Sequence, residues 1–401
     1  MGRRDFKFIV IGTGVAGRTA ATLAAKAGIK TAMVGFKNKP GSAAKARALT
    51  NAKVACFHGH ARFINAHEVV VGNRHLTADK FLIATGTELI DDKIKGLDTI
   101  AYFTPSEVRS LPNPPETVLV IGAGSCGCET AQNLASMGAK VILVEAQKNI
   151  LPREDKEVGQ FMQHCFEVRS QIRVLTGARV LSVEQDKKGN KVATYRRGEE
   201  THSVRAKAVV LAAGTKPAID ISLEKAGVKL NHGLIKVSRT LTTSNKNIWA
   251  AGSVLGGESS IEKSIYEATL ITSNLIKHGK AAVNYSGFMR VTETFPKIAK
   301  VGLNEKEARA LKRKVRSSLV SLAGVEHAKG VRIGLVKLST DRGGTMIGAT
   351  AVTPDADLVA QELAMAVRYG ISARELASTP HVAVNWGEAV RTAARKLAKK
   401  K

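Results

Sequence analysis

The chain has 401 residues, is 44% hydrophobic and lacks long polar or repetitive tracts, which predicts a globular protein of two or three domains. No apolar run is long enough to cross a bilayer, and the first β-type run begins at residue 6, too early to leave room for a signal peptide. The four cysteines show no C-x-x-C spacing and are too few for a disulfide scaffold. We therefore expect a cytoplasmic protein. The formal charge of +27 attracts polyanions, but basic residues are spread along the chain and aromatic content is 4%, which does not favour nucleic-acid binding as the main function.

The first predicted unit is a strand, a glycine loop, a helix and a second strand. Residues 6–11 form a β-rich run, an alanine-rich helical stretch ends at Gly28, and the next β run reaches Gly35. Between the first strand and the helix lies the motif G-x-G-x-x-G, at Gly12, Gly14 and Gly17. In this context the glycines permit a tight turn, close approach of a pyrophosphate and packing of helix on strand, while the helix N-terminus attracts the phosphates.

A candidate metal site follows at Cys56, His58 and His60, which alternate along one predicted strand and so would share a face. The sequence offers no convincing fourth ligand. A β-hairpin that carries polar side chains is the alternative, and we predict no metal.

The same pattern returns at residues 117–145, after a proline-rich stretch at 110–117 that we interpret as a linker. The second motif comprises Gly122, Gly124 and Gly127. Glu145 follows Gly122 by 23 positions, the spacing that separates Gly35 from Gly12. Cys126 and Cys128 occupy variable positions of this motif and point to different sides of a helix, so we do not expect a metal or redox pair there.

Each unit ends in a buried-type strand that runs into a small-residue turn, at residues 80–90 and 208–219. The second unit is therefore inserted within the chain of the first. Two nested dinucleotide-binding units predict two cofactors that meet to pass a hydride.

Later stretches make the chain similar to a known family. They are residues 223–257, 295–309, 345–378 and 385–395. With the two glycine motifs, in this order, they resemble the pyridine nucleotide–disulfide oxidoreductases, the group of lipoamide dehydrogenase, mercuric reductase and soluble transhydrogenase. The resemblance covers nearly the whole chain.

The resemblance implies an α/β fold with two nested Rossmann-like domains and a C-terminal α+β interface domain that forms a homodimer. It implies an FAD-binding domain at 1–112 and 245–285, an NAD-binding domain at 113–244, and an interface domain with a basic tail at 286–401. The residues that it assigns to FAD are Gly12, Gly14, Gly17, Ala61, Thr85, Gly86, Gly252 and Ser253. Those that it assigns to NAD(H) are Gly122, Gly124, Gly127, Glu145 and Gly214. A carboxylate at Glu145 accepts hydrogen bonds from both ribose hydroxyls and repels a 2′-phosphate, which favours NADH, although Glu145 could also be a solvated strand end.

The sequence also departs from the family. The segment that carries two redox-active cysteines is missing between residues 36 and 56. Gly35 and Ser253 stand where the family has acids that bind FAD. Alignment on Glu388 places Ala383 at the position of the catalytic histidine, with His381 two residues away.

Glu129 matches a family residue near the flavin and nicotinamide, but its usual lysine partner belongs to the missing segment, which leaves a catalytic role doubtful. We therefore predict an FAD-dependent NADH oxidoreductase that passes electrons to a small-molecule acceptor without a disulfide, such as a quinone, oxygen, a dye or a second nicotinamide. The alternative is a relative that has lost flavin and acts as a basic binding or assembly protein.

Overall fold

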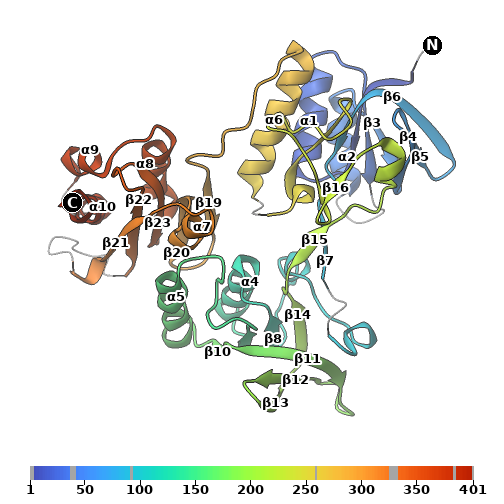
Figure 1. Cartoon of the computed structure of the whole chain (residues 1–401). Coiled ribbons are helices and arrows are strands. Elements are labelled where there is room, and N and C mark those ends of the chain that lie inside the picture. The colour runs from blue at the N-terminus through green and yellow to red at the C-terminus, as the bar shows by residue number, and fades with distance from the viewer. Residues whose placement is uncertain are drawn as a thin grey trace. The chain divides into compact units, whose positions relative to one another are not determined.

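The computed structural model describes residues 4–36, 42–90, 94–257, 260–324, 333–382 and 385–399. The chain forms two compact units, each with α-helices packed on β-sheets (Figure 1). Unit 1 comprises Met1–Leu89 and Thr215–Asn284, and unit 2 comprises Ile90–Gly214 and Tyr285–Lys401. Within these described ranges, none of the helices is long and apolar enough to span a membrane.

Unit 1 is built on a parallel sheet in which β1 lies between β2 and β6, with β3 beside β2 and β18 beside β6. Its strands are β1 (Phe6–Ile11), β2 (Thr31–Phe36), β3 (Ala55–His58), β4 (Ala61–Asn65), β5 (Glu68–Val71), β6 (Arg74–Ile83), β7 (Thr87–Leu89), β15 (Thr215–Pro217), β16 (Leu230–Asn231), β17 (Leu234–Ile235) and β18 (Ile248–Ala250). Its helices are α1 (Val15–Lys26), α2 (Ser42–Asn51) and α6 (Ile261–Lys277).

The core of unit 1 follows from the sequence pattern. Residues 8–11 of β1 are all buried, as expected for a central parallel strand covered on both faces. The buried face of α1 consists of small residues, five alanines and Gly17, which lets α1 pack closely against α6 and the sheet (Figure 1).

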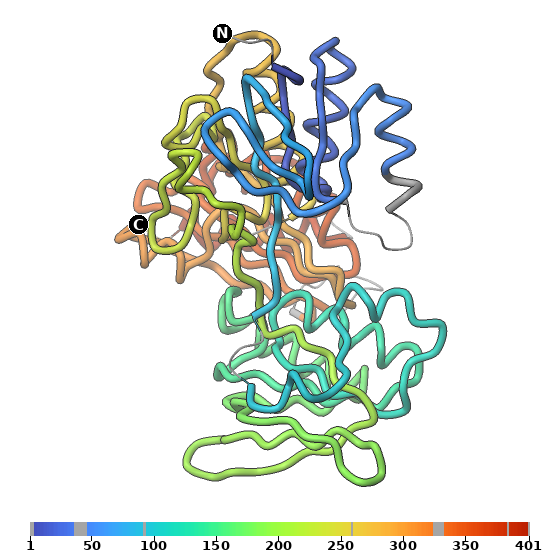
Figure 2. The backbone as a smooth tube through the Cα atoms, turned by 90° about the vertical axis from the view of Figure 1, so that its right-hand side faces the viewer, coloured from blue at the N-terminus to red at the C-terminus, as the bar shows by residue number. Residues whose placement is uncertain are grey.

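Among its described residues, unit 2 contains three sheets with their helices. The first is the parallel sheet β10-β9-β8-β14, which carries α4 and α5, and an antiparallel sheet β11-β12-β13 continues from it. The elements are α3 (Pro105–Val108), β8 (Thr117–Ile121), α4 (Ser125–Ser136), β9 (Lys140–Val144), α5 (Lys156–Val168), β10 (Arg173–Leu175), β11 (Ala178–Gln185), β12 (Lys191–Arg197), β13 (Glu200–Ala206) and β14 (Ala208–Leu211). In Figure 2 the hairpins of β11–β13 lie at the lower margin of the trace.

The C-terminal part of unit 2 is an antiparallel sheet in the order β19-β20-β23-β22-β21. Its elements are β19 (Met289–Thr292), β20 (Lys297–Gly302), α7 (Glu305–Ala310), β21 (Arg316–Ser321), β22 (Leu335–Thr340), β23 (Met346–Thr353), α8 (Ala356–Arg368), α9 (Ala373–Ser378) and α10 (Trp386–Lys399). One hydrophobic cluster joins the sheet to α8, α9 and α10. The other face is tied to α5 and the loop before it by ion pairs, among them Lys337 with Asp155 at 3.1 Å.

The predicted division into three domains, with boundaries at 112–113 and 244–245, stays a prediction. The chain passes between the two compact units three times, and the first two crossings lie at 89–90 and 214–215. Strands β7 and β15, which flank these crossings in unit 1, pair with each other. Residues 223–235 also belong to unit 1, because Leu223 and Ile235 are part of its hydrophobic core. The proline-rich stretch at 110–117 lies inside unit 2, between α3 and β8.

Candidate dinucleotide sites

The glycine loop of unit 1 joins β1 to α1 and is tightly packed at two of its three glycines. A Cβ atom on Gly12 would lie 2.1 Å from the Ala84 carbonyl oxygen, and one on Gly17 would lie 2.1 Å from the Gly12 carbonyl oxygen. At Gly14 a Cβ atom would meet nothing within 4 Å. Gly14 is the N-cap of α1, no side chain caps the helix, and its first turn contains no acidic residue. The loop thus leaves free N–H donors beside open space, the arrangement that accepts a pyrophosphate.

The loop of unit 2 repeats this geometry between β8 and α4. A Cβ atom on Gly122 would lie 2.5 Å from the Ala212 carbonyl oxygen, and one on Gly127 would lie 1.9 Å from the Gly122 carbonyl oxygen. Gly124 again faces open space and is the N-cap of a helix without a side-chain cap. The two halves of the chain therefore form two anion-binding cradles of one design.

Glu145 directly follows β9 and is 8% exposed. Its carboxylate accepts hydrogen bonds from the backbone N–H groups of Ala123, in the glycine loop, and Gln147, each at 2.8 Å. An ionised carboxylate has about four acceptor positions, so two stay available for ribose hydroxyls. The structure thus turns Glu145 toward the loop, as a ribose-binding acid requires, and does not support a solvated strand end.

Unit 1 has no counterpart of this acid. Gly35 adopts φ +113°, and its Cβ position would lie 3.5 Å from the Gly12 Cα atom. The spacing of 23 residues therefore brings Gly35 to the glycine loop, as it does Glu145. A side chain at Gly35 would be strained by the positive φ, so the local backbone disfavours an acid here.

The residue that follows the third glycine of each loop forms a hydrogen bond to the loop, a contact that was not predicted from the sequence. In unit 1 the Arg18 guanidinium donates a hydrogen bond to the Thr13 carbonyl at 2.7 Å. In unit 2 the Cys128 thiol donates to the equivalent carbonyl, that of Ala123, at 3.4 Å. Arg18 adds a positive charge beside the loop of unit 1. Comparison of the two repeats at this position could have revealed it.

Two distant segments of unit 1 meet its glycine loop. A Cβ atom on Gly252 would lie 3.1 Å from Cβ of Ala16, so residues 252–253 lie against the first turn of α1. The Gly252 N–H group donates at 2.7 Å to the fully buried carboxylate of Glu267, which sequence reasoning also missed. The backbone nitrogen of Thr85 lies 2.8 Å from the Cβ position of Gly12.

The other predicted cofactor residues lie at strand ends. The Thr85 hydroxyl donates to the Ala218 carbonyl at 2.6 Å, and the Gly86 carbonyl accepts the Ala218 N–H at 3.0 Å, so both residues hold the returning chain. Ala61 begins β4 and is buried in the hydrophobic core of unit 1. Gly214 ends unit 2 with φ +120° and accepts a hydrogen bond from the Ile90 N–H group.

Glu129, the candidate catalytic residue, is engaged within unit 2. Its carboxylate lies 3.4 Å from the Arg109 guanidinium and accepts a hydrogen bond from the Glu293 N–H at 3.1 Å. Next to it, both amide atoms of the Gln132 side chain bond to the backbone of Phe295. These contacts favour a structural role for Glu129, in which it joins α4 to the segment after β19.

The cysteines do not form a reactive pair. Burial raises the pKa of Cys128 far above its usual value, so this thiol stays protonated at neutral pH, whereas the neighbouring Cys126 is exposed. The prediction that Cys56, His58 and His60 share one strand is wrong, because β3 ends at His58 and Gly59 turns the chain with φ +118°. In the part of the chain that the structure describes, no group of three His, Cys, Asp or Glu side chains could hold a metal ion.

His381 forms a pair other than the one that the family pattern suggests. Its Nδ1 atom donates to the Thr379 carbonyl at 2.8 Å, and its Nε2 atom lies 3.7 Å from the carboxylate of Glu362 on α8. Burial raises the pKa of Glu362. Glu388 pairs with Arg391 at 2.6 Å. Ala383 lies outside the described residues.

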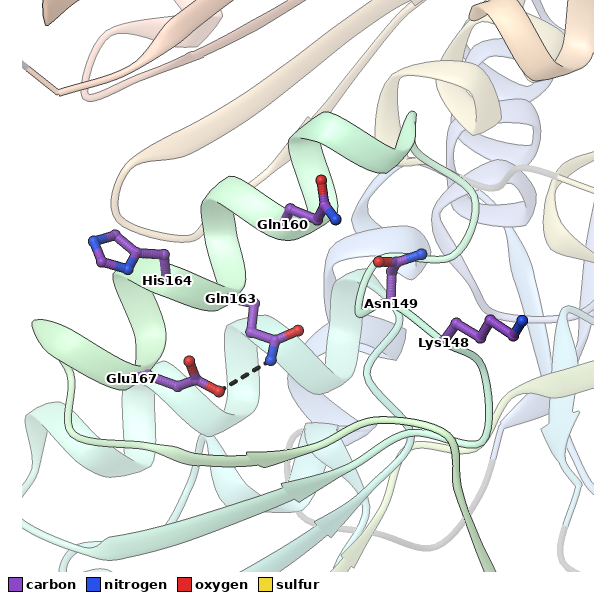
Figure 3. Close-up of a pocket in the computed structure, with 6 residues that line it drawn as sticks. All are labelled: Lys148, Asn149, Gln160, Gln163, His164 and Glu167. Carbon is purple, nitrogen blue, oxygen red and sulfur yellow. Dashed lines mark hydrogen bonds between the residues drawn. The ribbon is translucent and has the colours of Figure 1, made fainter. Parts of the chain in front are cut away.

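An open polar hollow lies beside the loop that follows Glu145. Figure 3 shows its lining, with Lys148 and Asn149 on that loop and the other four residues on α5. These are Gln160, Gln163, His164 and Glu167, and Gln163 donates to Glu167 at 3.0 Å. Because its lining is entirely polar, the hollow differs from the mostly apolar pockets that enclose small ligands. The two glycine loops remain the candidate sites.

Comparison with known proteins agrees with this geometry. Residues 41–270 match the family described as pyridine nucleotide-disulphide oxidoreductase, and residues 288–394 match its dimerisation domain. The chain belongs to this family. The resemblance and the α/β fold predicted from the sequence are thereby confirmed, and FAD and NAD(P)H are the cofactors of the family.

Individual relatives include a dihydrolipoyl dehydrogenase of Chlorobaculum parvum, 31% identical over 86% of this chain and 76% of the relative. A mercuric reductase of Bacillus cereus is 31% identical over 80% of this chain and 51% of its own length, so the chain spans about half of that relative. Among solved structures, the HOCl-induced flavoprotein disulfide reductase RclA from Escherichia coli matches with a TM-score of 0.82 and 21% identity, covering 99% of this chain and 100% of RclA. At this identity the match shows the fold alone.

Proposed function

We propose that the chain is an NADH-dependent flavoprotein oxidoreductase, with FAD at the glycine loop of unit 1 and NADH at that of unit 2. The observation that carries the proposal is the pair of open cradles at Gly14 and Gly124, each at an uncapped helix N-terminus. When bound, the two cofactors supply hydride transfer and electron delivery to an acceptor.

The residues of unit 1 would hold FAD by its phosphates. The N–H groups at the start of α1 bind the pyrophosphate, and Arg18 adds positive charge at the same loop. Gly252 and Ser253 lie against the first turn of α1 and would therefore bound the FAD site at that helix. Ser253 binds with a hydroxyl where the family has a carboxylate, which gives a weaker hydrogen bond.

NADH is favoured over NADPH because of Glu145. Its carboxylate accepts two backbone N–H groups and is thereby held at the end of β9, where a 2′-phosphate would be repelled.

We expect Glu145→Gln to raise the Kd for NADH about tenfold or more and to narrow the preference for NADH over NADPH. The amide nitrogen of glutamine cannot accept the N–H group that the lost oxygen held. Titration of each nucleotide by protein fluorescence measures the change. The matched control is Glu167→Gln, in the polar hollow on α5, which should leave both affinities unchanged. Equal effects of the two substitutions would contradict the assignment.

The acceptor is proposed to be a quinone, oxygen, a dye or a second nicotinamide. All four cysteines are free, and Cys128 is held as a thiol by burial, so we infer that Cys126 and Cys128 do not relay electrons to a disulfide. The purified protein should oxidise NADH with a soluble quinone and should not reduce oxidised glutathione or lipoamide. Turnover with either disulfide would contradict this part of the proposal.

The flavin-free alternative is favoured by one observation. The positive φ of Gly35 leaves unit 1 without the carboxylate that unit 2 has at Glu145. A basic binding protein that keeps the fold would be colourless and would not oxidise NADH.

The cytoplasmic location stays a prediction.

We also propose a homodimer formed through residues 288–394, the part that matches the dimerisation domain. The exposed face of α8 carries Leu358, Met365 and Tyr369, which are 69%, 57% and 71% exposed. The variant Leu358→Glu/Tyr369→Glu should be monomeric by light scattering, because dimer formation would bury two new carboxylates. The control Lys306→Gln/Lys314→Gln, at exposed positions on α7 and shortly after it, should stay dimeric. A dimeric Leu358→Glu/Tyr369→Glu variant would place the interface elsewhere.

A further inference from the structure

The outer face of the antiparallel sheet β11-β12-β13 carries two adjacent rows of polar side chains. In the first row, Arg179 on β11 lies directly opposite Arg196 on β12, which lies directly opposite Thr201 on β13. The neighbouring row is Ser182, Thr194 and Ser203. Residues directly opposite each other in a sheet point to the same face, so two guanidinium groups and four hydroxyl groups share one surface. The lowest strands in Figure 1 belong to this sheet.

Within the described part of the chain, these six side chains have no partner. None of them takes part in a side-chain hydrogen bond or an ion pair with any residue that the structure describes. The next row of this face consists of Glu184, Val192 and Arg205, and it differs because Arg205 pairs with Asp186 at 3.2 Å. Both unpaired arginines are exposed. The face therefore offers donors whose acceptors are not supplied by this chain.

Two arginines directly opposite each other repel, which disfavours the pairing of β11 with β12 unless an anion lies between them. Guanidinium groups bind phosphate oxygens by two parallel hydrogen bonds, and serine and threonine hydroxyls donate to the same oxygens. The two rows lie about 7 Å apart along the strands, so one extended anion can contact both.

The chemistry of the face narrows the partner. Tyr195, the aromatic residue of β12, points to the opposite face and stacks on His202 at 5.4 Å between ring centroids. No base-stacking surface is therefore present among the six. Membrane-binding surfaces combine basic side chains with several large apolar ones, whereas the six side chains here are polar and the large apolar side chain of β11 beside them is Leu181, which is 36% exposed.

We propose that this face binds the phosphodiester backbone of RNA without sequence preference. The formal charge of +27 draws a polyanion to the protein, and the Arg179–Arg196 pair provides a defined contact for it. This function goes beyond the proposed oxidation of NADH and does not depend on bound flavin.

The test is the salt dependence of binding to a fluorescently labelled 20-nucleotide RNA, measured by anisotropy with full-length protein. The variant Arg179→Gln/Arg196→Gln should bind roughly tenfold more weakly at low salt, and its slope of log Kd against log salt should fall by about 1.4, the value for two lost phosphate contacts on a single strand. The control variant Arg374→Gln/Lys396→Gln removes the same charge from exposed positions on α9 and α10 and should keep the wild-type slope.

Three results would overturn the proposal. The first is that the wild-type protein does not bind RNA at low salt, and the second is that both variants lose the same amount of RNA affinity. The third is that Arg179→Gln/Arg196→Gln loses binding to phosphatidylserine vesicles but keeps its binding to RNA. A second measurement separates function from folding. Without RNA, this variant should have a Tm equal to or above that of the wild type, because the repulsion is removed. A lowered Tm would show that the arginine pair supports the fold and would contradict the proposal.

Discussion

Replacing Gly124 by valine should abolish NADH binding while the protein stays folded and keeps its flavin. The backbone at Gly124 has φ −69° and ψ −177°, which any residue adopts, and a Cβ atom there meets no other atom within 4 Å. The valine side chain would instead occupy the space for the pyrophosphate. We expect a Kd for NADH at least about 100-fold higher, since contacts at the helix N-terminus would be lost. Isothermal titration with NAD⁺, which occupies the same site and cannot reduce the flavin, measures this loss.

The matched variant is Gly14→Val, at the same position of the loop in unit 1. Gly14 has φ −68° and ψ −175° and also faces open space. This substitution should give a folded protein that has lost FAD but still binds NADH. The pair of variants thus assigns one cofactor to each unit. The assignment fails if either variant loses both cofactors while its circular dichroism and Tm match those of the wild type.

The second large effect is expected at Lys337, a buried side chain of β22 whose ion-pair partners lie at α5 and α7 of unit 2. Its side chain is 4% exposed and its ammonium group lies 3.1 Å from Asp155, 3.2 Å from Glu157 and 3.2 Å from Glu305. Lys337→Met would leave these carboxylates without their shared cation, which costs about 3–5 kcal/mol of unfolding free energy. The control Lys306→Met, at an exposed position on α7, should change stability by less than about 0.5 kcal/mol. Urea denaturation measures both, and similar values for the two variants would contradict the role of this network.

The same network predicts how stability depends on pH. Burial acts to lower the pKa of Lys337, but Asp155 and Glu157 outweigh it, so the pKa is raised. This stabilisation is complete below the unfolded-state pKa of about 10.4 and is lost as pH rises through the higher folded-state value. Burial acts to raise the pKa of Glu305, but Ser317 and Lys337 lower it overall. Its contribution is present above about pH 4.3 and is lost as pH falls through the lower folded-state pKa. In Lys337→Met the alkaline dependence should disappear and the acidic dependence of Glu305 should weaken, and unchanged pH profiles would contradict the assignment.

The glycine loops could be predicted from sequence because their chemistry is local. Gly12 and Gly122 each follow a strand and precede a helix within about six residues, and backbone sterics restrict these positions to glycine. The equal spacing to Gly35 and Glu145 also indicated that both residues reach the loops. The fold class followed from this repetition.

The remaining features depend on contacts between distant parts of the chain. Glu267 on α6 reaches Gly252, and Glu129 on α4 reaches Glu293, which is 164 positions further along the chain. Nothing in the local pattern around these glutamates distinguishes them from solvated helix residues. The pairing of β7 with β15 was also missed, because both are three-residue strands that have little periodicity of their own.

The most direct test of the account is the flavin content of freshly purified protein. We expect a yellow protein that releases about one FAD per chain on denaturation and whose visible absorbance is bleached by NADH without oxygen. A colourless protein that takes up no FAD when it is supplied would contradict the proposed function.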